Sequence, residues 1–171
     1  MKTWLFFTRS EDWWSLLIRW ITRSQWAHMG VGFSLEDGTE WYFEALISHD
    51  VSGPRCAGDL ERWVRKHRRR AYEMIVLPCD SAASQRVWDE CIKLQGVAGY
   101  SKKQLLLMYL AMRFGLPVPN DPAKLVCSEF ASRAVIMGGV DLREPGSVSH
   151  DEVTPGSAYL RAMDLKGKEH G

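Results

Sequence analysis

The stretch HMGVGFSLEDGTEWYFEAL, residues 28–46, decides the fold, because it predicts two strands joined by a tight turn. Asp37-Gly38 stands between two runs rich in β-branched and aromatic residues, and such a pair is a strong signal for a hairpin. Side chains alternate along a strand, so Tyr42 and Glu44 share one face of the second run. An antiparallel hairpin is therefore expected to carry Glu44 next to the strand that begins at residue 28.

The remaining elements follow from the spacing of apolar residues and from turn signals. An acidic start at residues 10–12 can cap a helix, and Ser81 is the expected cap of another. The segment 102–114 is nearly apolar all round, so we expect that helix to be buried. The order of elements favours an α+β fold with a small antiparallel sheet packed against helices. Strands are predicted at 3–9 and 70–78, helices at 10–23, 59–67, 81–95, 102–114, 127–137 and 154–163, and a flexible tail at 164–171.

Length and composition restrict the class of protein. The 171 residues fit one domain spanning 1–171, and 46% apolar residues with 8 Trp exclude a largely disordered chain. A net charge of +1 excludes polyanion binding by bulk electrostatics. The 4 cysteines form no C-x-x-C pair, which argues against a zinc site and a disulfide framework. We expect no metal and no cofactor. Neither a signal peptide nor a membrane-spanning run is recognised, so a cytoplasmic protein is expected.

The segment KLVCSEF places Cys127 between an apolar run and a predicted helix. A thiol reacts as the thiolate, and the positive end of a helix and a nearby imidazole both lower its pKa. Of the five histidines, only His28 begins a predicted strand. Glu44 lies among apolar residues, where a carboxylate is costly unless it is paired. This pattern predicts Cys127 as nucleophile, His28 as general base and Glu44 as the group that orients the ring. The backbone N–H of Cys127 is a candidate oxyanion donor.

Each of these residues also has an ordinary structural interpretation. A cysteine in a half-apolar helix is usually a packed hydrophobe, and a histidine entering a strand is usually a satisfied structural residue. Glu44 could simply face solvent on an edge strand. The order of the three residues along the chain and their surroundings favour the catalytic interpretation over these.

The segments SQWAHMGVGF, WYFEAL and KLVCSEF resemble the His, Glu and Cys segments of the circularly permuted NlpC-type papain-like hydrolases, the YiiX-like group. VAGYSKKQLL is similar to the Gly-x-x-Tyr-Asp segment of that family, although Ser101 stands where Asp is usual. VTPGSAYL is similar to its Thr-Pro-Gly-Asp-Leu segment, with Ser157 and Ala158 in place of the last two residues. The resemblance covers about residues 3–160.

The resemblance implies a papain-like core in which a small antiparallel sheet packs against the nucleophile helix. It also implies attack on an acyl carbon by Cys127, with an acyl-enzyme as intermediate. Related proteins act on peptide-like amides, including those of bacterial cell walls, and others transfer fatty acyl groups. The substrate is thus a small peptide-like or acyl-bearing molecule. Tyr100 carries over as a site-lining residue, and Trp26 and Ser128 are further candidates for substrate contact.

Two other features carry alternatives. RWVRKHRRR, residues 62–70, packs six Lys and Arg, and could contact an anionic surface, which would suit a non-catalytic binding module. A solvated helix face is the plainer interpretation, and no nucleic-acid module surrounds it. Trp13 and Trp14 are adjacent, so one is expected to be exposed, which points to an acyl substrate and to a thiol-dependent acyltransferase or lipid thioesterase.

Overall fold

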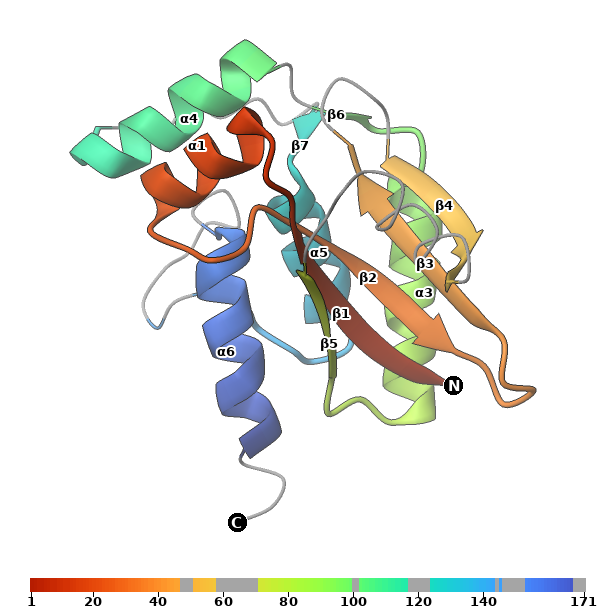
Figure 1. Ribbon diagram of the computed structural model, residues 1–171. Helices are drawn as coiled ribbons and strands as arrows, with labels where there is room; N and C mark the ends of the chain where they lie inside the picture. Colours follow the sequence, from red (N-terminus) through yellow and green to blue (C-terminus); the bar gives the residue numbers. More distant parts are fainter. Residues whose placement is uncertain are drawn as a thin grey trace.

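The structure is a computed structural model that describes residues 1–46, 51–57, 71–99, 102–116, 124–143, 145 and 153–167. The chain is α+β, with a five-stranded antiparallel sheet in the order β4-β3-β2-β1-β5 and a separate parallel pair, β6-β7 (Figure 1). The strands are β1 Lys2–Arg9, β2 His28–Ser34, β3 Glu40–Ala45, β4 Val51–Cys56, β5 Ala71–Val76, β6 Ala98–Gly99 and β7 Lys124–Leu125. The helices are α1 Trp13–Thr22, α3 Ser81–Leu94, α4 Lys102–Phe114, α5 Cys127–Ile136 and α6 Pro155–Gly167.

The predicted hairpin is confirmed. β2 and β3 pair antiparallel with Val31 opposite Phe43, and Gly38 in the turn has a φ of 82°. β1 pairs with β2 and places Trp4 opposite Gly32. The Trp4 ring covers this glycine so closely that a Cβ added to Gly32 would lie 2.1 Å from the ring. Glycine is required there, because aromatic rings from β1 lie directly across this stretch of β2.

The main core joins one face of the sheet to α3, α5 and α6. The sheet contributes alternate residues of its central strands, and the helices contribute small and apolar side chains that allow close approach. α5 packs against β2 and β3, so the first residue of this helix is held beside the central strands (Figure 1). The buried set from the sheet includes Leu5, Phe7, Met29, Val31, Phe33 and Phe43.

α1 and α4 form a helical pair that stands apart from the main core (Figure 1). Ile18 and Ile21 of α1 pack with Leu105 and Tyr109 of α4 in a second buried cluster. The expected burial of residues 102–114 holds in part: Leu105, Tyr109 and Ala111 are buried, whereas Phe114 is 70% exposed. Within the described residues α4 packs on α1, while Leu107 and Phe114 face solvent.

Other sequence-based expectations need correction. β4 was not predicted, because its Ser-Gly-Pro content has low strand propensity and its extended form depends on pairing with β3. The cap of α3 is Asp80, whose carboxylate accepts the N–H of Ala83, whereas Ser81 is the first helical residue. α6 continues through residues 164–167, which the sequence analysis assigned to a tail. The helix expected at 59–67 lies outside the described residues.

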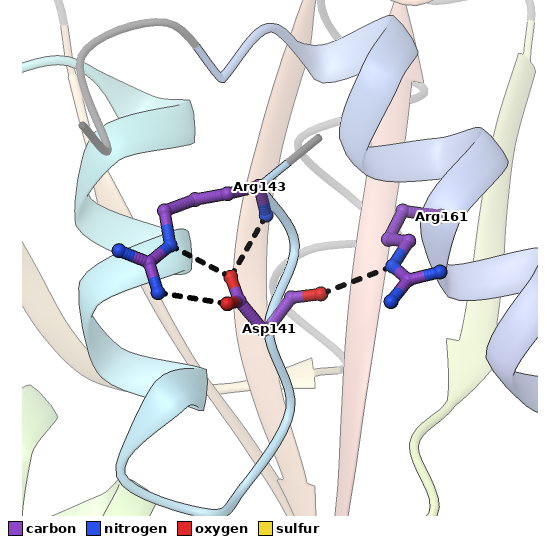
Figure 2. Close-up of polar contacts among 3 residues, drawn as sticks. All are labelled: Asp141, Arg143 and Arg161. Carbon is purple, nitrogen blue, oxygen red and sulfur yellow. Dashed lines mark hydrogen bonds and ion pairs between the residues drawn. The ribbon is translucent and has the colours of Figure 1, made fainter. Parts of the chain in front are cut away.

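Arg161 of α6 anchors the segment that follows α5 (Figure 2). The carboxylate of Asp141 accepts hydrogen bonds from the backbone and guanidinium of Arg143, the latter at 2.9 and 2.8 Å. Arg161 of α6 donates to the carbonyl of Asp141 at 3.3 Å. The carboxylate thus organises its own turn, while its backbone ties that turn to α6.

None of the helices in the described part of the chain has the length and apolar character needed to cross a membrane.

Candidate active site

The hairpin brings His28 and Glu44 together. Nε2 of His28 lies 2.9 Å from Oε2 of Glu44, so the ring N–H donates to the carboxylate. The Glu44 side chain is 1% exposed and that of His28 is 15% exposed. The other carboxylate oxygen lies 3.7 Å from a guanidinium nitrogen of Arg55 on β4. Glu44 is therefore a buried carboxylate held between two cationic partners, and one ring nitrogen of His28 is committed to it.

Cys127 meets the imidazole from the opposite element. It is the first residue of α5, after the N-cap Val126, and its thiol is half-buried. The sulfur lies close enough to the imidazole of His28 and to the backbone N–H groups of Met29 and Ser128 for all three to lower its pKa. The structure thus brings Glu44, His28 and Cys127 together, although helix and hairpin are far apart in sequence.

Charge coupling within this chain changes the pKa of both titrating groups. Burial raises the pKa of the Cys127 thiol, but the His28 charge and the hydrogen bonds to the sulfur together bring that pKa below its ordinary value. Burial lowers the pKa of His28, but the Cys127 charge, its hydrogen bond and Glu44 outweigh it and raise that pKa to about 9. Each charge therefore stabilises the other, which offsets the cost of burying the two groups in their ionised forms.

Tyr109 is a site residue that the sequence analysis did not identify. It is 1% exposed, and burial, followed by the nearby charge of Cys127, raises the pKa of its phenol, while the Ser128 side chain partly offsets this rise. Tyr109 also lines a pocket of about 310 Å³, with Ile21, Thr22, Arg23, Arg113 and Thr154. The signal was present in LLLMYLAM, where one phenol interrupts an apolar run and needs a partner once buried.

The other predicted contact residues lie differently from expectation. Trp26 is 4% exposed and packs between Phe7 and Tyr159, with ring centroids 6.1 and 5.4 Å away. It belongs to the core and is not an open wall. The Ser128 hydroxyl is fully buried and donates to the carbonyl of Val153 at 2.6 Å, so it faces the interior. Tyr100 lies outside the described residues.

The arrangement combines a thiol with a lowered pKa, a nearby imidazole and a carboxylate hydrogen-bonded to that imidazole. All four cysteines are free, and they differ in surroundings: Cys56 is exposed and Cys91 is buried. Burial, followed by the charge of Glu90, raises the pKa of Cys91. The pKa of Cys127, by contrast with that of Cys91, is lowered. No family model and no curated protein matches this sequence.

Proposed function

We propose that this protein is a cysteine hydrolase, an amidase or peptidase that cleaves peptide-like amides through an acyl-enzyme on Cys127. The observation that carries the proposal is the meeting of Glu44, His28 and Cys127: the carboxylate is hydrogen-bonded to the imidazole, and the imidazole and the thiol lie close enough for the pKa of the thiol to be lowered and that of the imidazole to be raised. A packed structural cysteine has no need of such partners, and burial alone would raise its pKa.

The reaction takes two steps. The Cys127 thiolate attacks the acyl carbon, and the amide C–N bond breaks as the imidazolium of His28 gives its proton to the departing amine. A water molecule then gives a proton to the neutral imidazole and attacks the thioester, which releases the acid and returns the thiolate–imidazolium pair. Cys127 is the first residue of α5, so its backbone N–H has no carbonyl partner within the helix and is free to stabilise the oxyanion.

The proposal includes a circularly permuted papain-like fold. In its support, His28 and Glu44 come from a hairpin that precedes the nucleophile in the chain, and the helix that begins at Cys127 packs on the two strands of that hairpin. The antiparallel sheet is the coarser feature on which this assignment is built.

A second candidate is a thiol-dependent acyltransferase or lipid thioesterase that uses the same site. It is favoured by one face of α1, where Trp13 and Trp20 are each 64% exposed and Leu16 is 49% exposed. These residues are spaced along one side of the helix, and an exposed apolar stripe of this kind suits an acyl chain or a lipid surface. Trp13 is thus the exposed residue that was expected of the pair Trp13 and Trp14. The two rings are stacked, with their centroids 4.4 Å apart.

Alkylation by iodoacetamide tests the shared core of both candidates. At pH 6.5 an ordinary thiol is about 1% ionised, so Cys127 should react much faster than the exposed Cys56, with modification of each read by peptide mass spectrometry. His28→Ala should remove the difference. Equal rates at the two thiols in the unaltered protein would contradict the proposal and favour a binding module.

Substrates then separate the two candidates. Release of amine from a peptide amide, lost in Cys127→Ala, supports the amidase. Transfer or hydrolysis of an acyl chain from an ester or a phospholipid, with no amide cleavage, supports the acyltransferase or thioesterase.

A further inference from the structure

The pocket beside Tyr109 lies where α1, α4 and α6 meet. Its lining comes from the end of α1, the second half of α4 and Thr154, the residue before α6. Its volume of about 310 Å³ is at the lower end of the range for small-molecule sites. The pocket can therefore hold one small group rather than a whole extended ligand.

Two independent connections join this pocket to the candidate nucleophile. Tyr109 lines the pocket and is close enough to Cys127 for the charge of the sulfur to raise the pKa of its phenol, after the larger effect of burial. Thr154 lines the pocket as well, and the preceding residue, Val153, accepts a hydrogen bond from Ser128, next to Cys127. Both connections place the pocket close to Cys127, with Tyr109 between the two.

The lining carries positive charge and no carboxylate. Arg23 and Arg113 are both exposed, and neither makes an ion pair with another residue in the described ranges. The Thr22 hydroxyl donates to the carbonyl of Ile18 at 2.8 Å, and the Thr154 hydroxyl interacts with Ser157 in the first turn of α6. The two guanidinium groups are therefore the donors that remain for a ligand, and planar guanidinium groups match carboxylate and phosphate oxygens.

The backbone at Arg23 adds a second, separate observation. Arg23 ends α1 in the left-handed conformation, with a φ of 51°, and is the non-glycine residue with positive φ in the described chain. Glycine or asparagine usually occupies such a position, since other side chains adopt it at a cost in energy. Arg23 therefore both ends α1 and places its side chain at the edge of the pocket.

We propose that this pocket binds an anionic group, a carboxylate or a phosphate, on the substrate that Cys127 attacks. The inference rests on the proposed function and names the substrate class: a molecule with a negative charge close to the scissile acyl bond. Arg23 and Arg113 contact that charge and determine specificity, while Tyr109 separates it from the reacting thiol. The first turn of α6 begins beside the pocket, where the helix dipole also favours an anion.

The test measures alkylation of Cys127 by a matched pair of probes, N-bromoacetylglycine and its neutral amide. In both, the sulfur displaces bromide and forms a thioether, so the two rates differ only through the carboxylate. A third probe, bromoacetamidoethyl phosphate, distinguishes a preference for phosphate from one for carboxylate. The ratio of anionic to neutral rate is read at Cys127 by peptide mass spectrometry.

The variants are Arg23→Gly, Arg113→Gln and their combination. Glycine suits the left-handed backbone at position 23, so the substitution removes the charge without disturbing the end of α1. Arg23→Asn provides a second variant compatible with the same backbone. Lys166→Gln is the matched control, because it removes one positive charge from the last turn of α6, at the end opposite the pocket. Unchanged melting temperatures verify that the variants are folded.

Removal of either arginine should lower the ratio of anionic to neutral labelling rate by about tenfold for at least one of the anionic probes. A tenfold change corresponds to the loss of about one charge-assisted hydrogen bond. The rate with the neutral probe should stay within about twofold, and Lys166→Gln should leave the ratio unchanged. An unaltered ratio in the double variant, for both anionic probes, would overturn the inference. Because the ratio compares probes at one thiol, it stays informative even if Cys127 reacts no faster than Cys56, the result that would overturn the proposed function instead.

Discussion

Glu44→Gln isolates the electrostatic part of the candidate site. The substitution keeps the size of the side chain and removes its negative charge. In the unaltered protein Nε2 of His28 lies 2.9 Å from Oε2 of Glu44, and the glutamine oxygen can still accept that N–H. Because that charge favours the imidazolium, its loss should lower the pKa of His28 from about 9. A less stable imidazolium stabilises the thiolate less well, so the pKa of Cys127 should rise toward that of an ordinary thiol.

The size of the effect follows from the burial of the pair. Two unit charges about 4 Å apart attract by about 4 kcal/mol at an effective dielectric constant of about 20, which is a ceiling. Glu44 is 1% exposed, so the cost of burying its charge cancels part of this attraction. A charge-assisted hydrogen bond contributes about 1.5–3 kcal/mol and a neutral one about 0.5–1.5 kcal/mol. The expected loss is thus about 1–2 kcal/mol, or a factor of about 5–30.

The assay is the rate of iodoacetamide labelling of Cys127 between pH 5 and pH 10. On the acid limb, where the thiolate is the minor form, the rate should fall by about 5- to 30-fold in Glu44→Gln. On the alkaline plateau the thiolate forms without help from the imidazolium, so the two proteins should agree within about twofold. His28→Ala should shift the acid limb further, since it removes the cation itself.

Glu40→Gln is the matched control, because it removes a carboxylate from the same strand at a residue that accepts from Ser34 and not from His28. Its labelling profile should superimpose on that of the unaltered protein. If Glu44→Gln lowered the rate equally at every pH and also lowered the melting temperature, Glu44 would be a structural residue. If its profile did not shift at all, the coupling between carboxylate and imidazole would be wrong.

Three further substitutions test the fold around the site. Cys127→Ser should abolish labelling at this position and turnover, yet shift the thermal midpoint by no more than about 4 °C, near 1 kcal/mol; a large loss of stability with turnover retained would indicate a buried structural role. Gly32→Ala should cost about 1–3 kcal/mol in urea unfolding, because the new Cβ would lie 2.1 Å from the Trp4 ring; unchanged stability would contradict the close approach. Asp12→Ala should lower the free energy of unfolding by about 1 kcal/mol, since Asp12 accepts the N–H of Ser15 at 3.0 Å. Asp12→Asn should keep most of that stability.

The sequence predicted the elements whose signals are local. The hairpin depends on a turn pair and on alternation within a few residues, and α1 begins after Asp12 at the acidic start that was expected. β4 carried no such signal, because its extended form comes from pairing with β3. Tyr109 was missed for a similar reason, since only the packing of α4 on α1 turns its phenol toward the interior.

Trp26 shows the opposite error. Its position two residues before His28 suggested a wall of the site, but proximity along the chain does not determine direction at the entrance to a strand. Trp26 precedes β2, and its ring packs between Phe7 and Tyr159, which come from β1 and α6. Residues from two separate elements decide that placement, and no local pattern contains them.

By itself, the sequence determined which chemical groups are available and on which kinds of element they lie: a thiol at the start of a helix, an imidazole at the start of a strand and a carboxylate on the neighbouring strand. The meeting of these groups was decided by tertiary structure, because the contact between Cys127 and His28 depends on α5 packing across β2 and β3. The lowered pKa of the thiol and the pocket lined by Arg23 and Arg113 also depend on residues from separate elements that packing brings together. Electrostatic coupling acts over a few ångströms of space, and only the packing of distant segments sets those separations.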